Sequence, residues 1–220
     1  MRTKTLLLTA ALSAVGLSTA MAQVYSVNAV GFVNVDIPSG LWIIANPLDA
    51  GAGNNTAAKL FPADKVPDGF TIYKFNPGNT TKPYDINQCV FAAWDIPDMA
   101  LEPGTGFWVL NPAATAYKVT FVGEVKQGTL TTPLPNGLSI TASQVPQAGQ
   151  PDTALGFPVV EGDTIYRYMR GTATAQKPYL IYNYVFGAWD EVPTVEVAEG
   201  FWVNKAGAAS WVRTFNVNTP

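Results

Sequence analysis

The sequence predicts an all-β protein with two tandem, duplicated, small β-sandwich- or barrel-like domains after a cleaved signal peptide. Short runs of β-branched and aromatic residues recur between Pro, Gly, Asn and Asp, which is the pattern of strands and turns. The 19 Gly and 17 Pro are spread throughout and leave no uninterrupted window for a long amphipathic helix. Motifs of the first half return in the same order in the second half, which indicates a duplication.

The N-terminus predicts export. A short basic start precedes the apolar residues 6–17, and Ala20-Met21-Ala22 supplies an A-x-A cleavage site before Gln23. This is the pattern of a Sec-type signal peptide over residues 1–22. We therefore expect a secreted protein that is extracellular, on the cell surface or periplasmic. No second apolar run approaches the roughly 18 residues of a membrane span, so we expect no membrane insertion.

The repeat extends through the rest of the chain. "VFAAWD" at Val90 returns as "VFGAWD" at Val185, "TIYKF" returns as "TIYRY", and "GFWV" occurs at Gly106 and again at Gly200. The offset between copies varies only from 93 to 97 residues, as expected when insertions fall in loops. We therefore predict a first β repeat over residues 23–127 and a second over 128–220. The join runs directly from one strand pattern into the next, so no flexible linker separates them.

Each copy reads as a series of strands of about five to nine residues. In the first copy the predicted strands are 24–37, 41–45, 71–75, 106–110 and 117–125, and in the second copy they are 138–143, 164–169, 178–186, 199–204 and 210–217. The best helical candidate is one or two turns over 54–61, ended by Pro62.

The first strand alternates, with Val33, Val35 and Ile37 on one face and Asn34 and Asp36 on the other. It has no clear counterpart before the second copy, where the sequence is more polar. We expect it to complete the sheet of its own domain rather than to add to the edge of a neighbouring molecule.

Two stretches carry a resemblance to a known family. "PSGLWIIANPL", "TIYKF" and "LEPGTGFWVLNP" together resemble a module common in exported bacterial proteins, and the start "QVYSVNAVGFVNVDIP" resembles secreted β-repeat proteins of Verrucomicrobia-like bacteria. The resemblance implies a fold and no particular chemistry. The second copy departs from the pattern at "LSITAS" and "EVAEGFWV". A ligand site that depended on Trp42 or Pro103-Gly104 would therefore exist in the first copy alone.

Composition excludes several classes of function. The chain has no histidine and one cysteine, so Ser-His-Asp and Cys-His catalysis, imidazole zinc sites and an internal disulfide are excluded. Because Arg2 and Lys4 leave with the signal peptide, the formal net charge changes from −3 to −5, which argues against a nucleic acid partner. No calcium-loop or phosphate-loop motif is present, and we expect no metal and no cofactor. Cys89 is expected to be a buried, small apolar residue.

The doubled aromatics are the main candidate site residues. The tryptophan pairs Trp94/Trp189 and Trp108/Trp202 have apolar neighbours, so packing in the core is the first interpretation. The alternative is an aromatic platform that stacks on sugar rings. For a glycan-binding site we selected Trp94, Trp189, Tyr182 and Tyr184.

Carboxylates supply the remaining candidates. Asp95 and Asp190 follow the doubled tryptophans and are expected to accept turn N–H groups. Pairing of Asp95 with Glu102, or of Asp190 with Glu196 or Glu199, would allow glycosidase chemistry if two acids faced one cleft. No residue was assigned a catalytic role.

These observations are compatible with three functions, of which the first is favoured. The first is a non-catalytic exported β-repeat protein with a structural or interaction role at the cell surface or in extracellular matrix. We expect its partners to be other copies of the chain or other envelope or matrix proteins. The second is a carbohydrate-binding module that uses exposed aromatics on a polysaccharide. The third is a carboxylate-based hydrolase.

Overall fold

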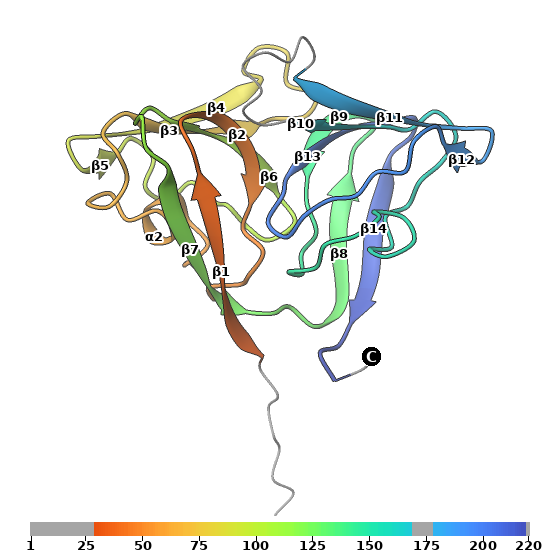
Figure 1. The fold of residues 1–220 in the computed structure, drawn as a ribbon, viewed down its shortest axis with the longest axis horizontal. Helices are drawn as coiled ribbons and strands as arrows, with labels where there is room; N and C mark the ends of the chain where they lie inside the picture. Colours follow the sequence, from red (N-terminus) through yellow and green to blue (C-terminus); the bar gives the residue numbers. More distant parts are fainter. Residues whose placement is uncertain (1–28, 169–177, 219–220) are drawn as a thin grey trace, which may run out of the picture.

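The computed structural model describes residues 29–168 and 178–218. Within them the protein is all-β and forms two similar sandwich-like halves (Figure 1). The elements of the first half are β1 (Val30–Ile37), β2 (Gly40–Ala45), α2 (Ala57–Leu60), β3 (Phe70–Phe75), β4 (Tyr84–Val90), β5 (Ala93–Trp94), β6 (Gly106–Asn111) and β7 (Tyr117–Glu124). Those of the second half are β8 (Gly128–Leu134), β9 (Gly137–Thr141), β10 (Thr164–Tyr168), β11 (Tyr179–Val185), β12 (Ala188–Trp189), β13 (Phe201–Lys205) and β14 (Ala209–Phe215).

Both halves have the same topology, and every strand pair is antiparallel. One five-stranded sheet has the order β2-β6-β3-β4-β5, and its counterpart has the order β9-β13-β10-β11-β12. A two-stranded sheet completes each half, β1 with β7 and β8 with β14. The predicted duplicated all-β fold is therefore confirmed. The predicted signal peptide and residues 24–28 of the first strand lie outside the described residues.

The first strand behaves as predicted in one respect and not in another. β1 pairs with β7 of its own half along its whole length, so it completes its own sheet. It does have a counterpart, because β8 pairs with β14 in the same way. The sequence pattern does not predict this strand, because β8 buries only Leu130 and Leu134 and threonines occupy much of the rest. Two buried positions on a short edge strand produce only a weak alternating pattern.

The core of each half lies between its two sheets. In the first half α2 leads into Phe61, which is fully buried and meets Phe107 and Phe121 edge to face at 6.2 and 5.9 Å. The helix spans four residues within the predicted 54–61 and stops before Pro62. In the second half Phe157, the repeat equivalent of Phe61, is buried and meets Phe201 at 6.1 Å and Trp211 at 5.2 Å. Large aromatic side chains thus anchor two cores that are individually small.

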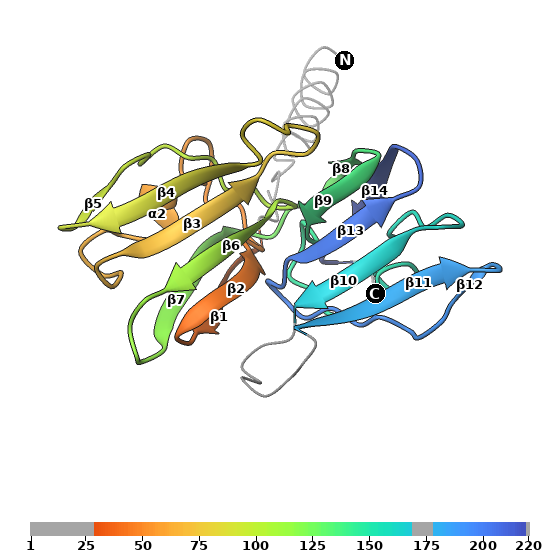
Figure 2. The ribbon, with the colours of Figure 1, turned by 90° about the horizontal axis from the view of Figure 1, so that it is seen from above.

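The two halves meet through reciprocal backbone contacts. The Ala45 N–H donates to the Ala198 carbonyl at 2.9 Å, and the Ala142 N–H donates to the Gly104 carbonyl at 3.1 Å. Ala45 is the last residue of β2, and Ala142, its repeat equivalent, directly follows β9. Each half thus gives the other the same contact, which is the pattern of an approximate two-fold axis. Figure 2 shows the two five-stranded sheets side by side in this arrangement.

The glycine of the doubled "GFWV" motif permits this contact. A Cβ on Gly106 would lie 2.5 Å from Ile140 Cγ2 and 3.3 Å from the Cα of Gly200. A Cβ on Gly200 would lie 2.8 Å from Ile43 Cγ2 and 3.1 Å from the Cα of Gly106. The backbones therefore approach each other at a distance that no side chain tolerates.

Candidate functional site

The outer faces of the two five-stranded sheets carry a shared set of aromatic side chains. Successive side chains in a strand alternate between faces, so Phe107 and Val109 enter the core while Trp108 between them faces outward. The same alternation applies to the equivalent strands of both halves. We call the resulting surface the aromatic trough; its residues are Tyr73, Phe75, Tyr84 and Trp108 of the first half and Tyr166, Tyr168, Tyr179 and Trp202 of the second.

Two aromatic contacts cross between the halves and form the floor of the trough. Phe75 meets Trp202 with ring centroids 4.7 Å apart, and Trp108 meets Tyr168 at 4.8 Å, both edge to face. These pairs are equivalent under the repeat, so the trough shares the approximate two-fold symmetry of the fold. Trp108 is buried, whereas Trp202 is only half-buried. Edge-to-face pairs of this kind stabilise by about 0.5–1.5 kcal/mol beyond their buried area.

The trough contains two cavities. The larger has a volume of about 570 Å³ and is lined by Leu41, Tyr73, Tyr84, Trp108, Leu110, Tyr168, Pro178, Tyr179 and Trp202. The smaller has a volume of about 320 Å³ and is lined by Leu138, Tyr166, Tyr179 and Trp202. The four residues of the smaller cavity are the repeat equivalents of Leu41, Tyr73, Tyr84 and Trp108. The duplication has therefore produced two related cavities on one surface.

Tyrosine hydroxyls are the main polar groups of this apolar surface. Burial raises the pKa of Tyr84, and burial, with the neighbouring Tyr168 and Tyr84, raises the pKa of Tyr179. Both hydroxyls are therefore protonated at neutral pH and keep their hydrogen for donation. The trough offers flat apolar rings together with hydroxyl donors, and none of the described residues that line either cavity is acidic.

The four residues selected from the sequence for glycan stacking lie elsewhere. Trp94 is 8% exposed and donates its indole N–H to the Phe61 carbonyl, and Tyr182 is 3% exposed in the second core. Neither presents a ring face to a ligand. Trp189 and Tyr184 are half-buried and pack on each other at 5.2 Å. None of the four lines a trough cavity.

A signal for the trough was present in the sequence. Trp108 and Trp202 stand out of phase with the core residues on either side of them in "GFWV", and the second Tyr of "TIYRY" stands at the end of β10 on the same outer face. The alternation alone could therefore have assigned these rings to the outer face. It could not show that the outer faces of the two halves adjoin.

The doubled "VF-A-W-D" motif forms a second feature, a tight hairpin in each half. Phe91 and Ala92 connect β4 to β5 with φ values of 50° and 55°, and Phe186 and Gly187 connect β11 to β12 with φ values of 55° and 78°. Positive φ at both central residues defines a type I′ turn, which favours Asn and Gly. Phe91 is 92% exposed and Phe186 is 98% exposed. Each half therefore places a phenylalanine at an exposed and strained turn.

Three of the five carboxylates considered for hydrolysis, Glu102, Asp190 and Glu199, have structural partners. Glu199 forms a bidentate pair with Arg167 at 2.8 Å, and Glu102 accepts a hydrogen bond from Asn55 Nδ2 at 2.8 Å. Asp190 accepts the backbone N–H groups of Asn183 and Glu191, as expected for a turn carboxylate. Within the described residues, no cluster of three or more His, Cys, Asp or Glu has the arrangement of a metal site.

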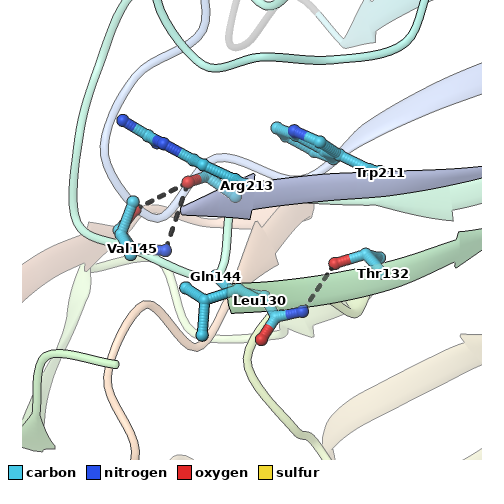
Figure 3. Close-up of a pocket in the computed structure, with 7 residues that line it drawn as sticks. Leu130, Thr132, Gln144, Val145, Trp211 and Arg213 are labelled. Carbon is cyan, nitrogen blue, oxygen red and sulfur yellow. Dashed lines mark hydrogen bonds between the residues drawn. The ribbon is translucent and has the colours of Figure 1, made fainter. Parts of the chain in front are cut away.

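A small cavity lies beside β8 and β14 (Figure 3). Its volume is about 10 Å³, room for roughly one water molecule. Gln144 closes one side and donates to the Thr132 hydroxyl at 2.8 Å, while Arg213 and Trp211 lie along β14. The size of this cavity excludes it as a ligand site.

Comparison of the chain with protein-family models, curated proteins and solved structures found no match. Among the described residues, no helix has the length and apolar character needed to cross a bilayer.

Proposed function

We propose that this protein is a non-catalytic, exported β-repeat protein with a structural or interaction role at the cell surface or in extracellular matrix, and that the aromatic trough is its binding surface. The observation that carries the proposal is the trough itself. Both repeats contribute equivalent aromatic residues to it, and most of these remain half-buried rather than enclosed. Contiguous apolar surface of this kind marks an interaction site in a soluble protein.

The duplication supports a binding role over a catalytic one. A reaction needs one set of catalytic groups, whereas two related cavities suit a partner that is itself repeated. The trough cavities offer aromatic rings and hydroxyls. Glu102, which bonds Asn55, and Glu199, which pairs with Arg167, do not line them. No observation therefore favours the carboxylate-based hydrolase.

Light scattering of the purified chain from Gln23 to Pro220, over a wide concentration range, tests the structural role. We expect the mean mass to rise with concentration, because the partners include a second copy of the chain. Binding of the chain to other envelope or matrix proteins would also support an interaction role. A strict monomer that binds a defined glycan would contradict the structural role.

Carbohydrate binding remains the second candidate because the trough has half-buried rings beside tyrosine hydroxyls. Such rings stack on the apolar faces of sugars while hydroxyls satisfy the polar edges. A glycan array and insoluble polysaccharides, with tryptophan fluorescence followed in the same samples, test it. Saturable binding with a fluorescence shift that Tyr179→Ser abolishes would support this candidate. The same binding retained in Tyr179→Ser would place the sugar outside the trough.

A further inference from the structure

We propose that Phe91 and Phe186 are apolar knobs that insert into the aromatic troughs of neighbouring copies and so link the protein into open-ended assemblies. This inference rests on the structural role proposed above and names both the partner and the contact.

The two knobs are not explained by the turns that carry them. A residue other than Gly, Asn or Asp at positive φ is strained, by about 1–3 kcal/mol. Phe91 and Phe186 both have positive φ, and nearly their entire side chains are exposed to water. Asn in the same position would fold the same turn without either penalty. The arrangement recurs in both repeats, so it indicates a role beyond the hairpin.

A carboxylate holds each knob in place. Asp68 accepts the Phe91 N–H at 2.7 Å, and Glu161, its equivalent in the second repeat, accepts the Phe186 N–H at 2.9 Å and the Gly187 N–H at 3.2 Å. Hydrogen bonds to a charged acceptor are stronger than neutral ones. The turn is thus fixed before any partner arrives, which lowers the entropy lost on binding.

Neither knob reaches the trough of its own molecule. Tyr84 lies in the trough at the start of β4, and Phe91 follows the end of that strand. Seven residues of extended strand separate the two positions by roughly 23 Å. Tyr179 and Phe186 have the same separation along β11. Figures 1 and 2 both show β5 and β12 at opposite ends of the molecule, so the two knobs point to different neighbours.

The trough matches a phenyl ring in chemistry and in number. Its lining is aromatic and aliphatic, and its cavities of about 570 and 320 Å³ have space for a phenyl ring. The protein has two knobs and two related cavities. Acidic residues flank the knobs, among them Asp68 and Glu161, and they disfavour an anionic membrane as the partner. The protonated hydroxyls of Tyr84 and Tyr179 are suitable donors to those carboxylates.

The geometry gives an open assembly. A knob at one end and a cavity in the middle form a heterologous contact, which continues from molecule to molecule unless the rotation closes a ring. One Phe buries roughly 150–250 Å², far below the area of a stable dimer. Each contact is therefore weak, and two knobs per molecule give association that depends steeply on concentration.

The test compares the natural chain with Phe91→Asn/Phe186→Asn in light scattering and sedimentation. Asn suits positive φ, so this variant is expected to fold at least as stably as the natural chain. We expect the concentration of half-assembly to rise by about tenfold or more, the factor that loss of a buried Phe contact carries. Phe32→Ser is the matched control, because Phe32 is an exposed phenylalanine on β1 away from the hairpins. It is expected to assemble like the natural chain.

A mixing experiment tests the socket. Leu41→Glu/Leu138→Glu replaces two exposed leucines on edge strands, one lining each cavity, with anions that repel the carboxylates flanking the knobs. At the concentration where the natural chain assembles, neither this variant nor the knob variant is expected to assemble alone. A mixture of the two is expected to associate, because one supplies knobs and the other supplies cavities. Assembly of the knob variant at the natural concentration, or a mixture that stays monomeric, would overturn the knob-in-trough contact alone. A natural chain that never assembles and binds no envelope protein would overturn the structural role itself.

Discussion

Single residues decide how the two repeats differ at the turn before "GFWV". Gly104 in the first copy and Ala198 in the second both have positive φ, 94° and 62°. The Thr105 N–H bonds the Glu102 carbonyl at 3.1 Å, and the Glu199 N–H bonds the Glu196 carbonyl at 3.2 Å, so the turns match. The turn at Pro103-Gly104 therefore recurs at Val197-Ala198, and the second copy places a Cβ where glycine is preferred.

We expect Ala198→Gly to raise the free energy of unfolding by about 1 kcal/mol, because the substitution removes the strain of a side chain at positive φ. Urea denaturation of the purified chain measures it. Gly104→Ala is the reverse test and should destabilise more, since its Cβ would lie 2.8 Å from Gln144 Cγ. An unchanged denaturation midpoint for Ala198→Gly would contradict the strain argument.

Cys89 is a buried cysteine whose thiol is expected to be unreactive in the native protein. Its side chain is 1% exposed, and burial, with smaller effects from Asp68 and Asp95, raises the pKa of its thiol. Both effects lower reactivity, because only an accessible thiolate attacks. We expect no labelling by a thiol reagent in the native protein at pH 8 and stoichiometric labelling after unfolding in urea. Rapid native labelling, read by mass spectrometry, would show that the site opens.

At the scale of elements, the sixth strand of each repeat ends in a buried polar residue, and the two repeats give that residue different partners. In the second half Lys205 of β13 and Asp163 before β10 are fully buried and form an ion pair, and Lys205 Nζ also donates to the Pro158 carbonyl at 2.6 Å. Asp163 further accepts the Ala206 N–H at 2.9 Å. In the first half the equivalent of Lys205 is Asn111, whose amide donates to the Ile37 carbonyl at 2.7 Å. The same position is thus satisfied by a charge in one repeat and by an amide in the other.

We expect Lys205→Met to destabilise the protein by about 3–5 kcal/mol, because it leaves the Asp163 carboxylate buried without its partner. The double variant Lys205→Met/Asp163→Asn removes both charges and should lose markedly less. Thermal unfolding of the single and double variants gives the coupling between the two groups. Equal losses in Lys205→Met and in the double variant would show that the charge pairing is not what the site requires.

On the scale of the whole molecule, the trough joins the two halves as well as offering a surface. Phe75 of one half packs on Trp202 of the other, and Trp108 packs on Tyr168 in return. Gly106 and Gly200 bring the backbones together below these rings. Each half is therefore stabilised by its contacts with the other half.

Unfolding of the natural chain should therefore be a single cooperative transition, with equal calorimetric and van't Hoff enthalpies. Phe75→Ala/Tyr168→Ala removes one ring from each crossing pair and should separate the transition into two. Differential scanning calorimetry distinguishes these outcomes. Two transitions in the natural chain would mean that the halves are energetically independent.

The sequence by itself determined the duplicated all-β fold, because alternation, turn residues and motif order are local properties that survive without tertiary contacts. It also indicated the short helix before Pro62 and the burial of Cys89. It did not reveal β8, whose two buried positions give too little alternation. It did not indicate the trough either, because the contact between the outer faces of the two halves is not a local property of either repeat.

Only the tertiary structure decided which aromatics enter the core of one half and which line the trough between the halves. Trp94 and Trp108 are both tryptophans in apolar strands, yet Trp94 enters one core while Trp108 meets Tyr168 of the other half. That difference depends on the contact between the two sheets, which involves residues about one repeat apart in the chain. A local pattern shows which side chains share a face of a strand, and packing alone shows what that face meets.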